Sequence, residues 1–317
     1  MKDQEMIVPG VTHAGLAALL ERHGLGALES VAYDEQTTSL LVNQTLVVRC
    51  QPDAARRSLL LKEALIYRRL HRGTDVPCPR VLALDTQRDL VDCDVLVLEQ
   101  IRGVIGSTVW PHLDSVQREQ ISEELGRICG SLHLLPWSVY GDLSTDEHGV
   151  RSAYWIDIVM QKTCRAYERA ARLDLLPPRV LDAFVTTIND SDSILCAADQ
   201  PVLTHTDLGL WNVVLRQDGA RWHVAAIVGW DAAITADPVW EFAPLWSAPI
   251  ANYPLPDAFM YGYRERRPPP HDLRIRRRIY RIIHHLEQAL ELRGQANADA
   301  ELINVYLTAV GQLLTPH

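Results

Sequence analysis

Residues 203–212 read Leu-Thr-His-Thr-Asp-Leu-Gly-Leu-Trp-Asn, the most informative run of this sequence. His205, Asp207 and Asn212 form the pattern H-x-D-x-x-x-x-N, in which a carboxylate and a carboxamide stand five positions apart. Two apolar runs follow, residues 213–215 and 224–228, on either side of Asp218-Gly219, a dipeptide typical of hairpin turns. The sequence therefore predicts a loop that carries polar side chains and leads into a β-hairpin.

This region resembles the aminoglycoside phosphotransferase family, a group of small-molecule kinases with the protein-kinase fold. The H-x-D-x-x-x-x-N spacing is that of a kinase catalytic loop. Downstream, residues 227–231 (I-V-G-W-D) and 236–241 (A-D-P-V-W-E) are similar to the family's I-D-W-E and G-D-P-x-x-D patterns. The resemblance implies a bilobal α+β fold with a small N-terminal antiparallel-sheet lobe, residues 1–103, and a larger, mainly helical C-terminal lobe, residues 104–317.

The resemblance also implies a catalytic and a metal-binding role. Asp207 would take the proton of an acceptor hydroxyl, and Asn212 would bind a Mg²⁺ that bridges the phosphates. The family's second metal ligand is the Asp before the Trp, and here Gly229 occupies that position without a ligand atom. Asp231 is the candidate replacement, because it would point to the same side of an extended chain. Asp231 would lie roughly 6–7 Å along the strand from the family's Asp position, which is large against a metal–oxygen bond of about 2 Å. The sequence is therefore compatible both with an active enzyme and with a protein that has lost catalysis.

Nucleotide-binding residues are expected in the N-terminal lobe. Arg49 ends an apolar strand at the position of the family's nucleotide-gripping Lys. Glu63, in the helix that follows, would pair with Arg49 and hold it toward the phosphates. The first hairpin lacks the family's phosphate-binding glycines, and the hydroxyls of Thr37 and Thr38 are the expected phosphate contacts.

Residues 99–103 (E-Q-I-R-G) resemble the family's hinge between the lobes. Backbone groups near Glu99 and Ile101 would bind adenine or guanine. Because backbone groups would recognise the nucleotide ring, the side chains at the hinge do not indicate which ring binds. ATP and GTP are therefore both candidate co-substrates.

Hydrophobic spacing and capping residues predict the remaining elements. We expect helices at residues 12–23, 53–71, 114–135, 155–173 and 179–189, and strands at 30–33, 40–42, 46–50 and 94–99. Asn43-Gln44 is predicted to be a tight turn. After Trp246 the chain is expected to be helical, with one strongly basic stretch whose arginines form a solvated helix surface. These arginines are Arg274, Arg276, Arg277, Arg278 and Arg281.

The composition limits the partners. A net charge of −9 argues against nucleic acid and is compatible with a cationic acceptor. Asp157, Glu168 and Glu241 are the carboxylates that could hold ammonium groups of such an acceptor. The six cysteines are scattered and read as reduced, mostly buried thiols of a cytoplasmic protein. No signal peptide or membrane span is expected.

The leading prediction is a phosphotransferase that uses Mg²⁺ and moves the γ-phosphoryl group of ATP or GTP to a hydroxyl of a small molecule. An aminoglycoside is one candidate acceptor, which would make the protein an antibiotic-resistance enzyme. The alternatives are a kinase-fold protein that binds a nucleotide or small ligand without catalysis, and a kinase for a macrolide, a sugar, choline or another metabolite. The acceptor, the base and the oligomeric state are left open by the sequence.

Overall fold

The computed structural model describes residues 6–34, 39–143, 150–246, 253–295 and 297–315. Chain contacts divide the protein into two compact units. The first comprises Met1–Gly106, Ser144–Glu147 and Val213–Asp231, and the second comprises Ser107–Leu143, His148–Asn212 and Ala232–His317. The predicted lobes, residues 1–103 and 104–317, have other boundaries than these two units, and the division into lobes stays a prediction.

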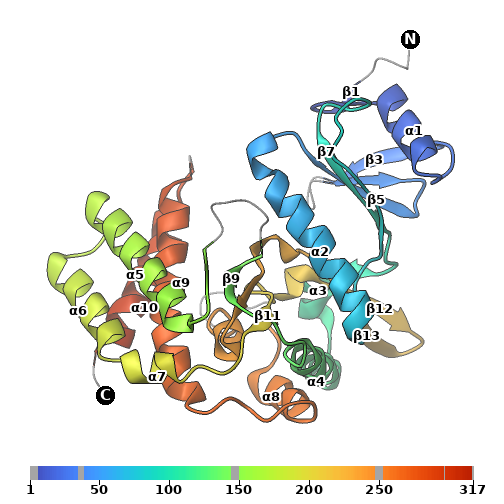
Figure 1. Ribbon diagram of the computed structural model, residues 1–317. Helices are drawn as coiled ribbons and strands as arrows, with labels where there is room; N and C mark the ends of the chain where they lie inside the picture. The colour runs from blue at the N-terminus through green and yellow to red at the C-terminus, as the bar shows by residue number, and fades with distance from the viewer. Residues whose placement is uncertain (1–5, 35–38, 144–149, 247–252, 296, 316–317) are drawn as a thin grey trace. The chain divides into compact units, whose positions relative to one another are not determined.

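The first unit is built on a five-stranded antiparallel sheet with the order β3-β4-β5-β7-β6 (Figure 1). The strands are β3 (Val31–Asp34), β4 (Ser39–Val42), β5 (Leu46–Gln51), β6 (Val81–Asp85) and β7 (Asp94–Glu99). Asn43 and Gln44, with φ of 52° and 54°, are the central residues of the predicted turn between β4 and β5, in which the Thr45 N–H donates to the Val42 carbonyl at 3.1 Å; a type I′ turn requires positive φ at both central positions. The sheet and its tight turn confirm the antiparallel lobe expected from the sequence.

Two helices cover opposite faces of this sheet. Helix α1 (His13–Arg22) follows the short strands β1 (Met6–Val8) and β2 (Val11–Thr12), and the Thr12 side chain caps it by accepting a bond from the Gly15 N–H. Its Leu16, Leu19 and Leu20 share one apolar core with Val48 of β5. Helix α2 (Arg57–Gly73) follows η2 (Ala54–Arg56) and packs on the other face, which carries Arg49. Alternation along β5 therefore separates a purely apolar face from a charged one.

The predicted hairpin completes the first unit. Strands β12 (Val213–Asp218) and β13 (Arg221–Ile227) pair antiparallel, and β12 also pairs with β8 (Val104–Ile105). Gly219 closes the hairpin with a φ of 62°. The backbone N–H of Ile227 donates to the carbonyl of Pro77 at 2.8 Å, which fixes the end of β13 within this unit.

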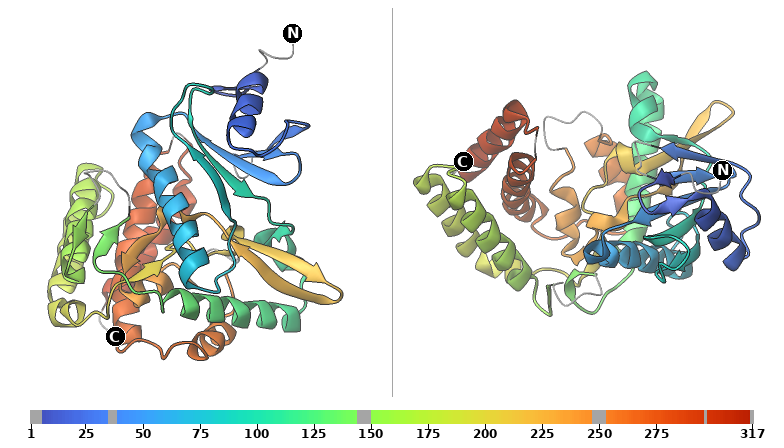
Figure 2. Two further views of the ribbon diagram at one scale, coloured as in Figure 1. Left: turned by 45° about the vertical axis from the view of Figure 1, so that its right-hand side comes forward. Right: turned by 90° about the horizontal axis from the view of Figure 1, so that it is seen from above.

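The second unit is mainly helical. Its helices are α4 (Ser115–Leu132), α5 (Trp155–Arg172), α6 (Pro178–Asn189), α7 (Asp192–Cys196), α8 (Pro256–Arg264), α9 (Leu273–Arg293) and α10 (Ala300–Leu314), with α3 (Gly106–Val109) and η3 (Trp110–His112) leading into them. A small sheet of order β10-β9-β14-β11 comprises β9 (Tyr140–Asp142), β10 (Arg151–Ser152), β11 (Val202–Thr204) and β14 (Ile234–Ala236). Asp114 caps α4 in a reciprocal capping box with Gln117. Helices α9 and α10 lie side by side in both views of Figure 2.

The basic stretch of α9 corrects one expectation. Arg274 is exposed as predicted, but Arg276 is only 2% exposed. Arg277 donates to the carbonyls of Phe242 and Leu245, and Arg278 donates to the carbonyls of Leu313 and Thr315. Guanidinium groups that satisfy the backbone carbonyls of neighbouring segments are structural, so the prediction of a solvated arginine surface is wrong.

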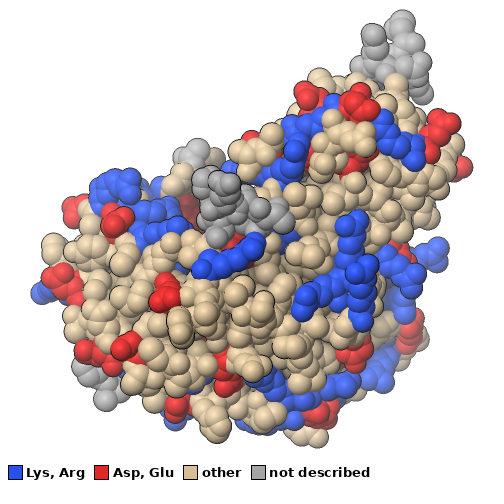
Figure 3. All heavy atoms as spheres, viewed as in Figure 1, with Lys and Arg blue, Asp and Glu red and all other residues tan. Residues whose placement is uncertain are grey.

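The surface shown in Figure 3 carries charges of both signs. Lys and Arg gather over the C-terminal half of α2, while Asp and Glu are scattered over the face that the figure shows. None of the helices in the described part of the chain combines the length and apolar character that a membrane span requires.

Candidate active site

Asp207 and Asn212 lie in the segment between β11 and β12, and the turn η4 (Leu210–Asn212) brings their side chains together. The amide nitrogen Nδ2 of Asn212 donates to the backbone oxygen of Asp207 at 2.8 Å and to its carboxylate Oδ2 at 2.9 Å. Because both partners are acceptors, the Asn212 amide faces them with its nitrogen. Its oxygen is thereby left to bind something else.

Trp211 makes a second bond to the same carboxylate oxygen. The indole Nε1 donates to Asp207 Oδ2 at 3.0 Å, and the ring packs edge-on against Tyr253 with the ring centroids 5.3 Å apart. A Cβ at position 209 would lie 2.3 Å from the indole ring, so Gly209 is required for this placement. Within the described part of the chain, no donor is bound to the other carboxylate oxygen, Oδ1.

Glu241 accepts hydrogen bonds from the backbone of the loop that carries Asp207. It lies in η6 (Pro238–Phe242) with a fully buried side chain, and its Oε2 accepts from the backbone N–H of His205 at 2.5 Å. Burial raises the pKa of Glu241 from 4.5 to about 8, while its bonds from the His205 and Thr206 N–H groups act in the opposite direction. The expectation that Glu241 could hold a substrate ammonium group is wrong, because the carboxylate faces the loop backbone and not solvent.

Thr206 shows that the loop conformation is imposed by its surroundings. This β-branched residue has a φ of 66°, in the left-handed region that side chains of this shape avoid. Its Oγ1 donates to the carbonyl of Ala232 at 2.9 Å, and its N–H bonds the Glu241 carboxylate. These contacts stabilise the strained residue directly before Asp207.

A buried ion pair fixes η6 itself. Asp237 caps η6 by accepting from the Val239 N–H at 2.9 Å. Its second oxygen accepts from the Tyr280 hydroxyl at 2.6 Å and from Arg276 Nη1 at 3.3 Å. Burial raises the pKa of Asp237 and the Tyr280 bond lowers it. Helix α9 is thus linked through Asp237 and η6 to the segment that carries Asp207.

Arg49 and Glu63 form an ion pair in the first unit. Arg49 Nη1 lies 2.7 Å from Glu63 Oε1, and the Tyr67 hydroxyl donates to the same oxygen at 3.2 Å. The negative charge of Glu63 raises the pKa of Arg49, and Asp231 adds to this effect. Burial raises the pKa of Glu63; Arg49 lowers it and Asp231 raises it. The exposed carboxylate of Asp231 therefore lies near this pair.

The hinge residues are placed at the end of β7. The Glu99 N–H donates to the carbonyl of Arg80 at 2.9 Å and is thus engaged within the first unit. The carbonyl of Ile101 accepts from the side-chain amide of Gln100 at 3.3 Å. The expected phosphate contacts Thr37 and Thr38 lie outside the described residues.

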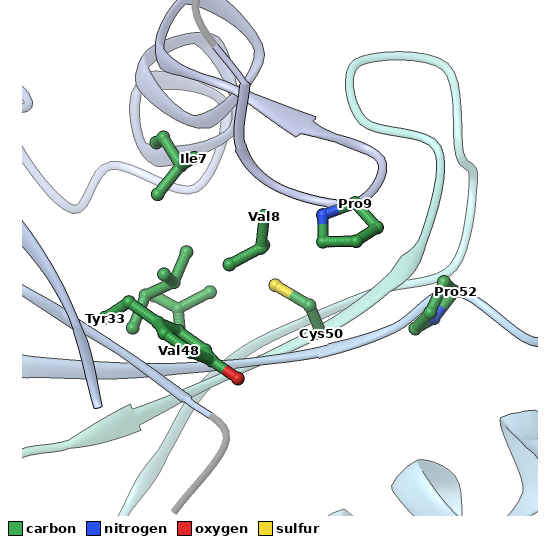
Figure 4. Close-up of a pocket in the computed structure, with 8 residues that line it drawn as sticks. Ile7, Val8, Pro9, Tyr33, Val48, Cys50 and Pro52 are labelled. Carbon is green, nitrogen blue, oxygen red and sulfur yellow. The ribbon is translucent and has the colours of Figure 1, made fainter. Parts of the chain in front are cut away.

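A cavity of about 360 Å³ opens on the apolar side of the five-stranded sheet (Figure 4). Val48 and Cys50 line it together with Tyr33 and residues 7–9. Because side chains alternate along β5, Arg49 points to the opposite face. The cavity is therefore separate from the Arg49–Glu63 pair and is no candidate for the phosphates.

The six cysteines are free thiols, and three of them, Cys78, Cys93 and Cys129, are buried.

Several contacts of the loop were not predictable from its motif. The buried partners Glu241 and Arg276 carry no local signal of their role, because each contacts residues more than thirty positions away. Trp211 lies inside the H-x-D-x-x-x-x-N pattern, two residues after Gly209, but at a position that the pattern leaves unspecified.

Comparison with known proteins extends the resemblance over most of the chain. The sequence pattern of the phosphotransferase enzyme family matches residues 29–273. No curated protein matches the sequence. Among solved structures, a streptomycin–ATP–APH(2″)-IIa ternary complex aligns with a TM-score of 0.66 at 15% identity, covering 97% of each chain. Aminoglycoside 2′-phosphotransferase-IIIa with GDP gives a TM-score of 0.67 at 15% identity, covering 93% of this chain and 96% of the other.

A third structure shows that the likeness is not restricted to aminoglycoside enzymes. A putative fructosamine-3-kinase from Thermobifida fusca aligns with a TM-score of 0.67 at 19% identity, covering 93% of this chain and 98% of the other. At these identities the structures establish the fold, which is the bilobal α+β, protein-kinase-like fold predicted from the sequence. Together with the match over residues 29–273, they place this chain in the phosphotransferase enzyme family.

Proposed function

We propose that the protein transfers the γ-phosphoryl group of ATP or GTP to a hydroxyl group of a small molecule. The observation that carries the proposal is the contact between the side chains of Asp207 and Asn212, five residues apart in a loop with the kinase spacing. Support also comes from structural neighbours of the same fold, one solved with streptomycin and ATP and one with GDP. The base and the acceptor are not fixed by this likeness.

In the proposed reaction Asp207 orients the acceptor hydroxyl and accepts its proton as the oxygen attacks the γ-phosphorus. Arg49, held by Glu63, is proposed to bind the phosphates. Backbone groups near Glu99 and Ile101 are proposed to bind the adenine or guanine ring of the nucleotide. A fixed guanidinium donates two parallel bonds to phosphate oxygens, which suits a residue that must position a polyphosphate.

Mg²⁺ is the metal ion that the fold implies, and its proposed ligands are Asn212 and Asp231. The Asn212 amide fits the role, because its nitrogen is committed to Asp207 and its oxygen remains. In the described part of the chain no three His, Cys, Asp or Glu side chains form a metal site on their own. Mg²⁺ is commonly held by one or two protein oxygens together with substrate phosphates. Once bound, Mg²⁺ would neutralise charge on the phosphates.

Nucleotide consumption across a panel of acceptors tests the proposal. The protein is incubated with Mg²⁺ and ATP or GTP in the presence of amino-sugars, macrolides, simple sugars and choline, and phosphorylated product is identified by mass. The amino-sugar arm tests an aminoglycoside acceptor. An Asp207→Asn variant must lose turnover, whereas Asp218→Asn in the exposed hairpin turn serves as the matched control and must retain it. Unchanged turnover in Asp207→Asn would contradict the assignment.

A second candidate function is a kinase-fold protein that binds nucleotide without transferring phosphate. The observation in its favour is Gly229, which has a φ of 78° and no side chain where the family has its metal-binding Asp. Aspartate is one of the few residues that adopts positive φ at modest cost, about 1–2 kcal/mol, so the position can be tested.

The Gly229→Asp variant separates the two candidates. If the missing carboxylate limits catalysis, Gly229→Asp raises turnover and lowers the Mg²⁺ concentration needed for half-maximal rate. Gly229→Asn is the matched control, because it shares the backbone strain without the charge. Nucleotide binding without turnover in the wild type and in Gly229→Asp would support the silent protein.

A further inference from the structure

The side chain of Trp211 forms a contact with the carboxylate of Asp207 that the function as proposed leaves unused. We propose that Trp211 is a positioning residue that fixes which oxygen of Asp207 receives the acceptor's proton. The inference rests on the proposed function, since it assumes that Asp207 is the base.

Both hydrogen bonds to the Asp207 carboxylate arrive at the same oxygen. Trp211 Nε1 lies 3.0 Å and Asn212 Nδ2 lies 2.9 Å from Oδ2. Two donors on one oxygen stabilise negative charge there and make that oxygen the poorer proton acceptor. Rotation of the carboxylate would break both bonds at once. Oδ1 is therefore the oxygen presented to the acceptor.

The residues around the indole hold it in this position. Gly209 leaves the space in which the ring lies, since a Cβ there would come within 2.3–2.5 Å of three ring atoms. The Tyr253 ring packs edge-on against the indole, with the ring centroids 5.3 Å apart. Tyr253 lies close enough to Asp207 that the carboxylate contributes, after burial, to raising the pKa of its phenol. The indole thus has both a glycine and an aromatic ring as close neighbours.

The proton and the phosphoryl group then move as follows. The acceptor O–H bond breaks, its proton passes to Oδ1 of Asp207, and the acceptor oxygen bonds to the γ-phosphorus. The bond between the γ-phosphorus and the bridging oxygen breaks, and the nucleoside diphosphate leaves with that electron pair. Oδ2 keeps both hydrogen bonds throughout. The loop therefore enters the reaction with its base already oriented.

Kinetics of two variants test the positioning role. Trp211→Phe removes the donor and keeps a ring, and Gly209→Ala keeps the indole but displaces it. With the acceptor that gives the highest turnover in the panel, each should lower kcat by about tenfold to a hundredfold, the effect of one bond to a charged group, and leave the nucleotide KM unchanged. Trp222→Phe, on the half-buried indole of β13, is the matched control and should leave kcat unchanged.

A spectroscopic measurement tests the contact without turnover. The protein has eight tryptophans, and the indole N–H signal of Trp211 in a ¹H–¹⁵N spectrum is the one missing from Trp211→Phe. Asp207→Ala should shift that signal and leave the Trp222 signal in place. An unshifted Trp211 signal, or an unchanged kcat in a folded Trp211→Phe, overturns this inference alone. Turnover that survives Asp207→Asn, or a wild type without turnover, overturns the proposed function and with it the catalytic meaning of the contact.

Discussion

Asp207 is surrounded by residues that leave it little freedom. Asn212 and Trp211 bind one of its carboxylate oxygens, and Glu241 binds the backbone N–H groups of the two residues before it. Thr206 keeps a strained φ of 66° within this set of contacts. Backbone strain directly beside a carboxylate oxygen that accepts two hydrogen bonds is typical of functional loops, in which geometry is kept at a cost in stability.

Glu241 gives a prediction about pH. Because burial raises the pKa of Glu241 to about 8, from 4.5 in an exposed chain, the folded protein binds a proton over an interval in which the unfolded chain has lost it. The contribution to stability is complete below the unfolded pKa and is lost as the pH rises through the folded pKa. The free energy of unfolding of the wild type, relative to Glu241→Gln, should therefore fall between about pH 5 and pH 8.

Urea denaturation of both proteins across this range is the measurement. Glu241→Gln keeps an oxygen that accepts the His205 and Thr206 bonds but cannot ionise, so it isolates the titration from the geometry. Two stability curves that run parallel from pH 5 to pH 9 would show that Glu241 does not titrate in this interval.

At the scale of elements, helix α9 connects the basic stretch of the sequence to the loop. Arg276 pairs with Asp237, Asp237 caps η6, and η6 carries Glu241. Arg277 of the same helix binds the carbonyls at Phe242 and Leu245, directly after η6. The order of the loop thus depends on a helix that is more than sixty residues further along the chain.

The contact between α4 and α8 gives a prediction about packing. A Cβ at Gly262 would lie 1.9 Å from the Glu123 carbonyl oxygen, and one at Gly126 would lie 2.0 Å from the Phe259 carbonyl oxygen. Since backbone and not a flexible side chain is in the way, Gly262→Ala must push the two helices apart. We expect a loss of about 1–3 kcal/mol in the free energy of unfolding.

Gly311→Ala in α10 is the matched control for this prediction. Nothing lies within 4 Å of a Cβ built at Gly311, so the substitution adds helix propensity without a clash. It should raise the free energy of unfolding by about 0.5–1 kcal/mol. Equal effects of the two substitutions in chemical denaturation would refute the close approach of α4 and α8.

At the scale of the whole molecule, the fold persists while the sequence diverges. Solved structures that share 15–19% identity with this chain cover at least 93% of it. Gly229, which stands where the family resemblance implies an Asp, and the run Gly-Leu-Trp at residues 209–211 lie in the loops proposed to carry the chemistry. Differences in acceptor or in activity within this fold are therefore to be sought in those loops.

Local patterns predicted much of this architecture. The helix after Thr12, the turn at Asn43-Gln44, the strand at residues 94–99 and the hairpin after Asn212 depend on capping, turn chemistry and alternation within a few residues, and the structure contains each of them. The Arg49–Glu63 pair is also present, and its expectation came from the family pattern.

What sequence patterns missed depends on tertiary contacts. Hydrophobic periodicity predicts that the arginines lie on the outer face of α9, but it cannot show that the buried Asp237 pairs with Arg276. In the same way, Glu241 looks like a surface carboxylate until its burial under the loop is known. The bond from Trp211 to Asp207 depends on a glycine two positions earlier, a relation that no standard motif describes.

The most direct test of the account is the initial rate of phosphoryl transfer by the wild type and by Asp207→Asn, measured with one nucleotide, Mg²⁺ and the acceptor that gives a mass-identified phosphorylated product. If Asp207 is the base, Asp207→Asn binds the nucleotide with unchanged affinity and forms product at least about a hundredfold more slowly. Equal rates of product formation by the two proteins would contradict the account.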